Sequence, residues 1–175
     1  MSQQELSTVQ SIGSWRAWSP KPVGELQSSV LRGCFSAWEE LRGSAKLPSC
    51  DAVTPRYFKA WLTHISLIRV LADGDFEFRL VGDAIAQTYG DVPLRGCKVS
   101  DLAADVAGNL RAGYSDLVAK KTPGAYEGWL HYKGDWYYRE LLLLPFGSDG
   151  ESVDHIMSIG VNGEHSLEPP PFVSH

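Results

Sequence analysis

The segment from Trp136 to Phe146 most constrains the fold, because it carries apolar or aromatic side chains on both faces of an extended strand. A strand with one polar face can border water, whereas this one has to be central in a sheet and covered on both sides. The chain must therefore supply helices for two opposite layers. With 175 residues it can build a sizeable core as one domain, without disulfides or a structural metal.

Two further strands are predicted at His64–Leu71 and Asp75–Val81, on either side of Asp73-Gly74. An Asp-Gly pair between alternating apolar residues favours a two-residue type I′ turn. With such a turn, one face of the hairpin is apolar and would join the core. That face would carry Ile65, Leu67, Leu71, Phe76, Phe78 and Leu80.

Three strands close the chain, at Ala125–Tyr132, Trp136–Phe146 and Val153–Val161. The first two are joined by a tight turn at Lys133-Gly134-Asp135 and would pair as a hairpin, which sorts their side chains onto two faces. One face would carry Trp129, His131, Trp136, Tyr138, Glu140 and Leu142, and the other Tyr126, Leu130, Tyr132, Tyr137, Arg139, Leu141 and Leu143.

Helical patterns precede and separate these strands. A short helix over Ala84–Tyr89 and a longer one over about 102–121 are predicted between the hairpins, and a helix from Pro22 to about Arg42 and a short one over 56–63 before them. The N-terminal helix packs on its own domain or also meets a dimer or partner protein, and the sequence leaves both open. Its apolar stripe consists of Leu26, Val30, Phe35, Trp38 and Leu41.

This order predicts an α+β fold, in which a five-stranded antiparallel sheet has helices inserted between strands two and three. The N-terminal amphipathic helix would cover the other sheet face. We expect a flexible arm over residues 1–21, a helical segment over 22–63, the core over 64–163 and a Pro-rich tail over 164–175. Trp15 and Trp18 interrupt the polar arm, which indicates that it docks on its own domain or on a partner.

Three short motifs occur in order along the chain. They are Leu47-Pro48-Ser49, the run Phe78-Arg79-Leu80-Val81-Gly82 before a short helix and Tyr89-Gly90, and Glu140-Leu141-Leu142-Leu143-Leu144-Pro145 before Asp149-Gly150. Over about residues 34–162 the chain resembles a family of small stand-alone bacterial PAS-like proteins. Lys133-Gly134 replaces the family's frequent Asp-Gly turn, and Leu141 stands where many members have Arg. The resemblance implies a PAS topology and a sensory or regulatory domain that holds a small molecule between sheet and helices, or docks proteins.

Two sets of residues are candidates for a ligand pocket. Trp129, His131, Tyr138 and Glu140 share a sheet face and could ring a ligand, or they could be ordinary core and surface side chains. By resemblance, the second strand and the helix after it border the PAS cavity, although a filled core would need the same residue types. This second set is Phe76, Phe78, Leu80, Ile85 and Tyr89.

Charge and composition argue against several partners. The formal net charge of -5 lacks the basic footprint of a general nucleic-acid binder. No apolar run approaches the roughly 20 residues that cross a bilayer, and the N-terminus has no secretory pattern. Three widely spaced cysteines suit a reducing compartment. We therefore expect a cytoplasmic protein with neither a nucleic-acid nor a membrane partner.

Cofactor and catalytic motifs are absent from the sequence. The five histidines lack metal-ligand spacing, which predicts no metal site. Residues 102–121 contain no His for haem, and Cys97 lies outside the flavin-adduct motif of photosensor PAS domains. The cofactor stays unknown, and no catalytic residue is assigned. We expect a homodimeric sensor that binds a small ligand, a signalling protein or both. The alternatives are a ligand-free adaptor and an enzyme using Glu140 with His131 or Tyr138.

Overall fold

The computed structural model describes residues 15–53, 55–89, 91, 93–102, 104–132 and 135–166. These residues form an antiparallel sheet with the strand order β1-β4-β5-β6-β2-β3. The strands are β1 (Trp15–Lys21), β2 (Ile65–Val70), β3 (Phe76–Val81), β4 (Gly124–Tyr132), β5 (Asp135–Phe146) and β6 (His155–Ser166). The helices are α2 (Ser29–Arg42), α3 (Pro55–Phe58), α4 (Asp83–Thr88) and α5 (Ala104–Lys120), with 3₁₀ turns at Val23–Glu25, Cys50–Ala52, Lys59–His64 and Val99–Asp101.

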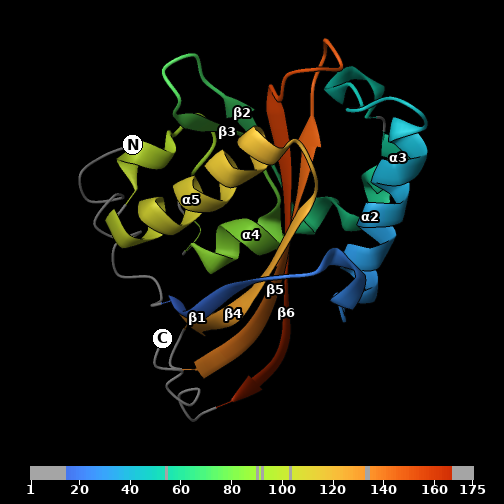
Figure 1. Ribbon diagram of the computed structural model, residues 1–175. Coiled ribbons are helices and arrows are strands. Elements are labelled where there is room, and N and C mark those ends of the chain that lie inside the picture. Colours follow the sequence, from blue (N-terminus) through green and yellow to red (C-terminus); the bar gives the residue numbers. More distant parts are fainter. Residues whose placement is uncertain are drawn as a thin grey trace.

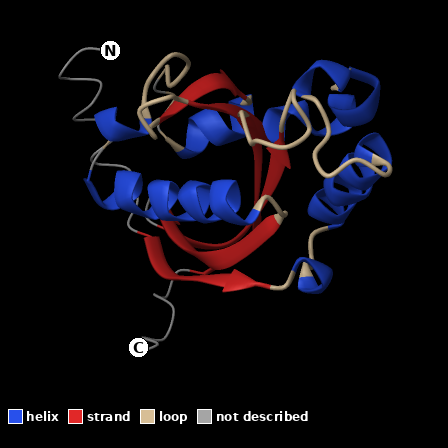
Figure 2. Cartoon of the chain, turned by 45° about the horizontal axis from the view of Figure 1, so that its top comes forward, coloured by secondary structure: helices blue, strands red, loops and turns tan. Residues whose placement is uncertain are grey.

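The central position predicted for the strand ending in Leu144-Pro145 is confirmed by β5. It lies between β4 and β6, and every residue from Arg139 to Phe146 is buried. Leu141 and Leu143 belong to a core under α4 and α5, whereas Leu142, Leu144 and Phe146 belong to a second core under α2. Alternate residues of one strand thus enter two cores, and helices lie on both sides of the sheet (Figure 1). Figure 2 shows the strands curling around α5. The predicted α+β fold and antiparallel sheet are therefore confirmed.

The N-terminal helix begins later than predicted. α2 starts at Ser29 because the Ser28 hydroxyl accepts a hydrogen bond from the Leu31 N–H and caps it, and it ends at Gly43. Pro22 instead precedes a single 3₁₀ turn. Of the predicted stripe, Leu26 and Trp38 are buried, and Val30, Phe35 and Leu41 are partly buried against the same core. Trp38 also donates from Nε1 to the Pro145 carbonyl at 2.9 Å. The stripe therefore packs on its own domain.

A sixth strand corrects the expectation of a flexible arm over residues 1–21. β1 pairs antiparallel with β4, with a register shift between Arg16 and Ser19, and Trp18 stacks on Tyr126 at 5.8 Å between ring centroids. Local composition hid this strand, because its stability comes from pairing with a sheet edge more than a hundred residues away. Residues 1–14 lie outside the described residues.

The face assignment of the β2–β3 hairpin was wrong near its turn. The Leu71 N–H donates to the Asp75 carbonyl, so three residues rather than two form the turn, and Gly74 has a positive φ of 83°. A three-residue turn shifts the pairing by one residue relative to a two-residue turn, which places Val70 opposite Phe76 and Ile68 opposite Phe78. A bulge between Leu67 and Ile68 then restores the expected pairing of Leu67 with Leu80.

The last strand is longer than predicted and enters the expected tail. β6 continues to Ser166, because the twelve residues of β5 offer a pairing edge as far as Trp136. The assignment of 164–175 to an unstructured tail is therefore wrong for residues 164–166. Residues 167–175 lie outside the described residues.

Candidate functional site

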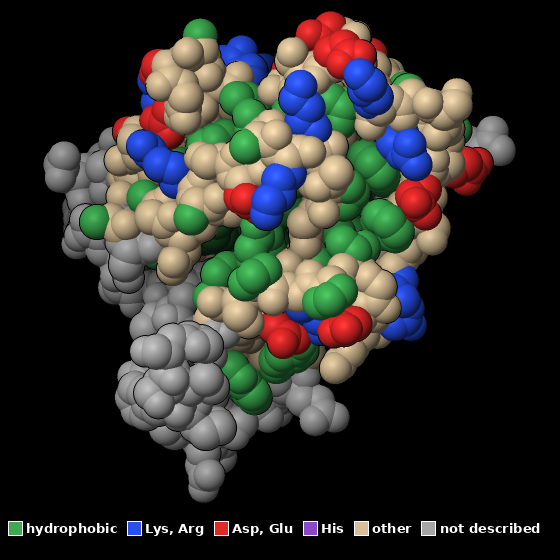
Figure 3. Space-filling model, viewed as in Figure 1, with side chains coloured by type: hydrophobic (Ala, Val, Ile, Leu, Met, Phe, Trp, Pro, Cys, Tyr) green, Lys and Arg blue, Asp and Glu red, His purple; other side chains and the backbone are tan. Residues whose placement is uncertain are grey.

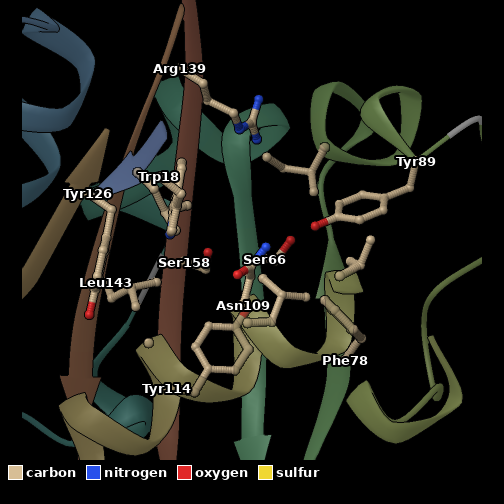
Figure 4. Close-up of a pocket in the computed structure, with 15 residues that line it drawn as sticks. Trp18, Ser66, Phe78, Tyr89, Asn109, Tyr114, Tyr126, Arg139, Leu143 and Ser158 are labelled. Atoms are coloured by element: carbon tan, nitrogen blue, oxygen red, sulfur yellow. The ribbon is translucent and has the colours of Figure 1, made fainter. Parts of the chain in front are cut away.

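A cavity lies between the sheet and the layer formed by α4 and α5, and each of the six strands supplies at least one lining side chain (Figure 4). Hydrophobic side chains border a hollow between the helices and β1 in the space-filling view (Figure 3). The open space is about 40 Å³, enough for a few waters, since each needs roughly 10–15 Å³ or more. The lining side chains that carry polar groups are Trp18, Ser66, Tyr89, Asn109, Tyr114, Tyr126, Arg139 and Ser158.

Arg139 brings a positive charge to this cavity. Arg139 is 3% exposed, and its side chain is the one charged side chain among the described residues that line the cavity. Nη1 donates to Asn162 Oδ1 at 2.6 Å, while the guanidinium lies against the backbone of Gly160, where a methyl group would collide with Nη2. Burial lowers the pKa of Arg139, and the nearby Tyr89 hydroxyl opposes that shift. Arginine nevertheless stays protonated in proteins, so the cavity wall is cationic.

Hydroxyl groups surround the same space. Ser66 on β2 and Ser158 on β6 are directly opposed and buried. The Ser158 hydroxyl is hydrogen bonded to Tyr114, whereas Ser66 Oγ finds no hydrogen-bond partner within the part of the chain that the structure describes. Burial raises the pKa of Tyr89, which keeps its hydroxyl protonated. In Figure 4, Tyr89 and Arg139 point inward from opposite sides of the cavity.

A second polar cluster lies on the opposite face of the sheet. Glu140 is 3% exposed and accepts hydrogen bonds from the Gln27 N–H, the Ser28 N–H and Lys21 Nζ, with shortest distances of 3.0, 2.8 and 2.8 Å. Lys21 Nζ also bonds Glu127, which accepts from the Tyr138 hydroxyl. We call the cluster of Lys21, Gln27, Ser28, Glu127, Tyr138 and Glu140 the N-terminal junction, because it ties the end of β1 and the start of α2 to the central strand.

The pKa values of this junction follow its hydrogen bonds. Burial by itself would raise the pKa of Glu140, but the bonds from Gln27, Lys21 and Ser28 outweigh it and leave that pKa lowered. Burial likewise works against the charge of Lys21, yet its bonds to Glu127 and Glu140 raise its pKa. The N-terminal junction therefore keeps the side chains of Lys21 and Glu140 ionised.

Comparison with known proteins decides the family. The model of the PAS domain family matches residues 26–160, which is most of the chain. The chain belongs to the PAS domain family. No curated protein and no solved structure matches it. Within the described residues of this PAS domain, no helix is long and apolar enough to cross a membrane, and no group of three His, Cys, Asp or Glu side chains could hold a metal ion.

The set predicted by resemblance falls partly on the cavity of this PAS domain. Phe78, Ile85 and Tyr89 line it, and Phe76 packs edge-on against Tyr114 within the same core. Leu80 is instead 43% exposed, because the bulge in the β2–β3 hairpin turns it away from the cavity. Leu80 is therefore withdrawn as a lining candidate. The other four remain predicted ligand contacts.

The second predicted set shares a face, as expected, but on the opposite side of the PAS sheet. Trp129 pairs with Tyr138 and His131 with Trp136. Trp129, Tyr138 and Glu140 line an open groove beside the start of α2, about 990 Å³ in volume, and His131 packs on Trp136 at 4.8 Å between rings. None of these four residues lines the cavity under α4 and α5. They therefore do not form one pocket with Phe78, Ile85 and Tyr89.

Sequence reasoning missed the polar groups that distinguish the cavity of this PAS domain. Arg139 was placed on the correct strand face without a role, and Ser66 and Ser158 were not singled out. The available signal was a charged residue inside an otherwise apolar central strand, since such a residue is rarely buried without a partner of some kind. Trp18 did give a signal: the sequence indicated docking on the domain or on a partner, and the structure shows Trp18 stacked on Tyr126 of its own domain.

Proposed function

We propose that this PAS domain is a sensory or regulatory module of bacterial signal transduction, acting in the cytoplasm by binding a small molecule in the cavity between the sheet and α4 and α5. The observation that carries this proposal is the buried guanidinium of Arg139, which lines the cavity together with the hydroxyls of Tyr89, Ser66 and Ser158. A few convergent polar groups in an apolar wall are the usual composition of a small-molecule site.

Two structural connections support an output through the N-terminal segment. Trp18 of β1 lines the cavity and lies three residues before Lys21 of the N-terminal junction. Arg139 and Glu140 are neighbours on β5, one facing the cavity and the other holding the start of α2. A ligand that favours one position of Trp18 or β5 would thereby bias the position of α2 for a signalling protein or a second copy of the chain.

The test begins with the purified protein as it is expressed. Native mass spectrometry is expected to show a copurified small molecule, or a metabolite panel is expected to raise the melting temperature. Hydrogen exchange should then slow at β1 and at the start of α2 when the active compound is added. If no molecule copurifies and no compound shifts the melting temperature, the sensor proposal fails.

The small volume of the cavity favours a second candidate function. A space of about 40 Å³ is well below the roughly 300–1,000 Å³ of ordinary ligand sites. An adaptor with a filled core would need no larger space and would act through its surfaces, including contacts in a homodimer. It predicts silent ligand screens together with self-association or partner capture that is lost when exposed residues of α2 are changed, as measured by light scattering and pull-down.

Glu140 does not suit the role of general acid or base that the enzyme alternative gives it. Both carboxylate oxygens of Glu140 already accept hydrogen bonds from the protein, and the lowered pKa keeps the group ionised. A general acid or base needs a free position toward its substrate and a pKa near the working pH. We therefore assign Glu140 a structural role and propose no reaction for the chain.

A further inference from the structure

We propose that the groove between the second half of α2 and the turn after α5 docks a segment of a partner protein that carries a large apolar side chain flanked by carboxylates. This α2–α5 groove shares no lining residue with the cavity under α4 and α5, so the inference does not depend on a small-molecule ligand. Its basis is an apolar floor with a cationic rim, on a chain whose formal net charge is -5.

Aromatic side chains of α2 form the floor of the α2–α5 groove, which is about 290 Å³ in volume. Phe35 and Trp38 stack with ring centroids 6.3 Å apart, and Phe35 is only partly buried. Val23 and Pro123 complete the apolar lining. In the space-filling view, hydrophobic side chains gather between α5 and α2 with Lys and Arg side chains beside them (Figure 3). The floor can therefore receive an apolar side chain of a partner.

The rim of the groove carries more positive than negative charge. Its charged side chains are Glu39, Arg42, Lys46 and Lys121. Lys46 pairs with Glu151, but the two side chains are 74% and 63% exposed, so this pair contributes little. Arg42 and Lys121 form no ion pair with any residue that the structure describes. Charge complementarity therefore favours a segment whose carboxylates can meet these two cations.

The fold holds both of these cations at the groove. The Arg42 guanidinium lies over the Trp38 ring, 5.4 Å from its centroid, and Nη1 donates to the Ala45 carbonyl at 3.0 Å. Lys121 follows the last turn of α5 with a positive φ of 59°, and its N–H donates to the Leu117 carbonyl at 2.7 Å. Glycine is the residue favoured at a helix end of this conformation. A lysine here adopts a costly backbone conformation but brings a charge to the rim.

The shape of the surface favours an extended segment over a compact small molecule. A second hollow of about 300 Å³ adjoins the groove along β1 and the end of α5. The two hollows share Val23, Thr122 and Pro123. The charged side chains of the second hollow, Lys21, Asp116 and Lys120, are already paired within the protein. The unpaired charge therefore lies at the α2–α5 groove, and the second hollow offers room for the rest of a peptide.

The experiment titrates ¹⁵N-labelled full-length protein with acetylated and amidated peptides and follows the backbone signals by NMR. The first peptide is Glu-Glu-Trp-Glu-Glu, and three others replace every Glu by Gln, every Glu by Lys, or the Trp by Gly. We expect the first peptide to shift the signals of residues 35–42 and 121–124. The other three should bind more weakly by about fivefold or more, since each loses the charged contacts or the apolar anchor. Added salt should weaken the first peptide but not its Gln counterpart.

Single substitutions then locate the site. Lys121→Gly removes one cation and suits the positive φ of its position, so it should weaken the first peptide by about three- to tenfold without lowering the melting temperature. A purely structural role of Lys121 at the end of α5 would instead change the melting temperature and leave binding unchanged. The matched control is Lys59→Gln, which removes the same charge from an exposed lysine outside the groove and should leave binding unchanged.

Other outcomes overturn the inference in recognisable ways. A Gln peptide that binds as tightly as the first peptide, or a Lys peptide that binds more tightly, would refute an acidic partner. Equal losses of affinity for Lys121→Gly and Lys59→Gln would show a general effect of net charge. Dimerisation that is lost in Lys121→Gly would assign the groove to a second copy of the chain. If Lys121→Gly does not fold, Lys121→Gln takes its place. Failure of every peptide to bind, or shifts confined to other elements, would refute the groove and leave the cavity proposal standing.

Discussion

Arg139 and Glu140 are adjacent residues of one strand, both 3% exposed, yet they face opposite layers and differ in how they are held. Glu140 is fixed by donors from three positions of its own chain, at the junction of β1 and α2. Arg139 lies at the wall of a cavity, and its guanidinium packs against Gly160, where a Cβ would collide with it. A buried charge whose bonding sites are filled by the fold indicates a structural role. Arg139 instead lines a cavity, which is why the proposed function assigns it a contact with a ligand.

Glu140→Gln should produce the largest loss of stability. The substitution keeps the shape of the side chain but removes the charge that meets Lys21 and turns an amide N–H₂ toward the Gln27 or Ser28 N–H. Breaking one partner of a buried ion pair costs about 3–5 kcal/mol, and we expect an effect near that range in urea unfolding. Hydrogen exchange should also become faster at Gln27 and Ser28.

The matched control for this change is Glu127→Gln. Glu127 bonds the same Lys21, but its side chain is 37% exposed, so water can replace much of what is lost. The expected loss is at most about 1 kcal/mol. Equal losses of stability for the two substitutions would show that Glu140 contributes no more to folding than Glu127, the more exposed partner of Lys21.

Gly160→Ala should produce the next largest effect, on the other side of the strand. A Cβ at this position collides with the guanidinium of Arg139, which would have to move within a buried site. Overpacking of this kind costs about 1–3 kcal/mol. Thermal unfolding of Gly160→Ala, Arg139→Met and the double variant measures the coupling. We expect the double variant to be more stable than the sum of the single losses implies, and strict additivity would place Arg139 away from Gly160.

The architecture could be predicted from the sequence because a few segments determine it. The run from Trp136 to Phe146 required cover on both faces, and the tight turn predicted before it sorted the side chains of the two flanking strands onto two faces. The pairing of Trp129 with Tyr138 confirms that reasoning. The faces of the β2–β3 hairpin also depend on the length of its turn. Their prediction was wrong because one additional turn residue reverses the faces near the turn.

The candidate site could be predicted only in part. Sharing a face is a local property, whereas the layer that covers each face depends on distant contacts of α2 and α5. The sequence could not show that Arg139 faces the cavity and Glu140 the helix start. β1 posed the same problem, since its pairing with β4 joins segments more than a hundred residues apart.

Acid should weaken the N-terminal junction with a defined sign. The pKa of Glu140 in the folded protein lies below its ordinary value of 4.5, because its hydrogen bonds outweigh burial. Its contribution to stability is therefore complete above about pH 4.5, and it is lost as the pH falls through the folded pKa. The difference in unfolding free energy between the unmodified protein and Glu140→Gln should shrink below pH 4.5. A difference that stays constant to lower pH would contradict an ionised Glu140.

Ser66→Ala should have the smallest effect, and its sign separates a binding site from a core. Ser66 Oγ is buried without a hydrogen-bond partner among the described residues, so removing the hydroxyl removes a desolvated group and loses no bond. We expect the free energy of unfolding of the ligand-free protein to change by less than about 0.5 kcal/mol, or to rise slightly. Ser158→Ala, at the position directly opposite, removes a hydrogen bond to Tyr114 and should lower the free energy of unfolding by about 1 kcal/mol.

The comparison of the two serine variants has two informative outcomes. If Ser66→Ala instead destabilises the protein as much as Ser158→Ala, the Ser66 hydroxyl already has a hydrogen bond in the free protein and is not available to a ligand. If it leaves stability unchanged but weakens binding of a cavity ligand, the hydroxyl serves recognition, as the comparison of the two sheet faces requires.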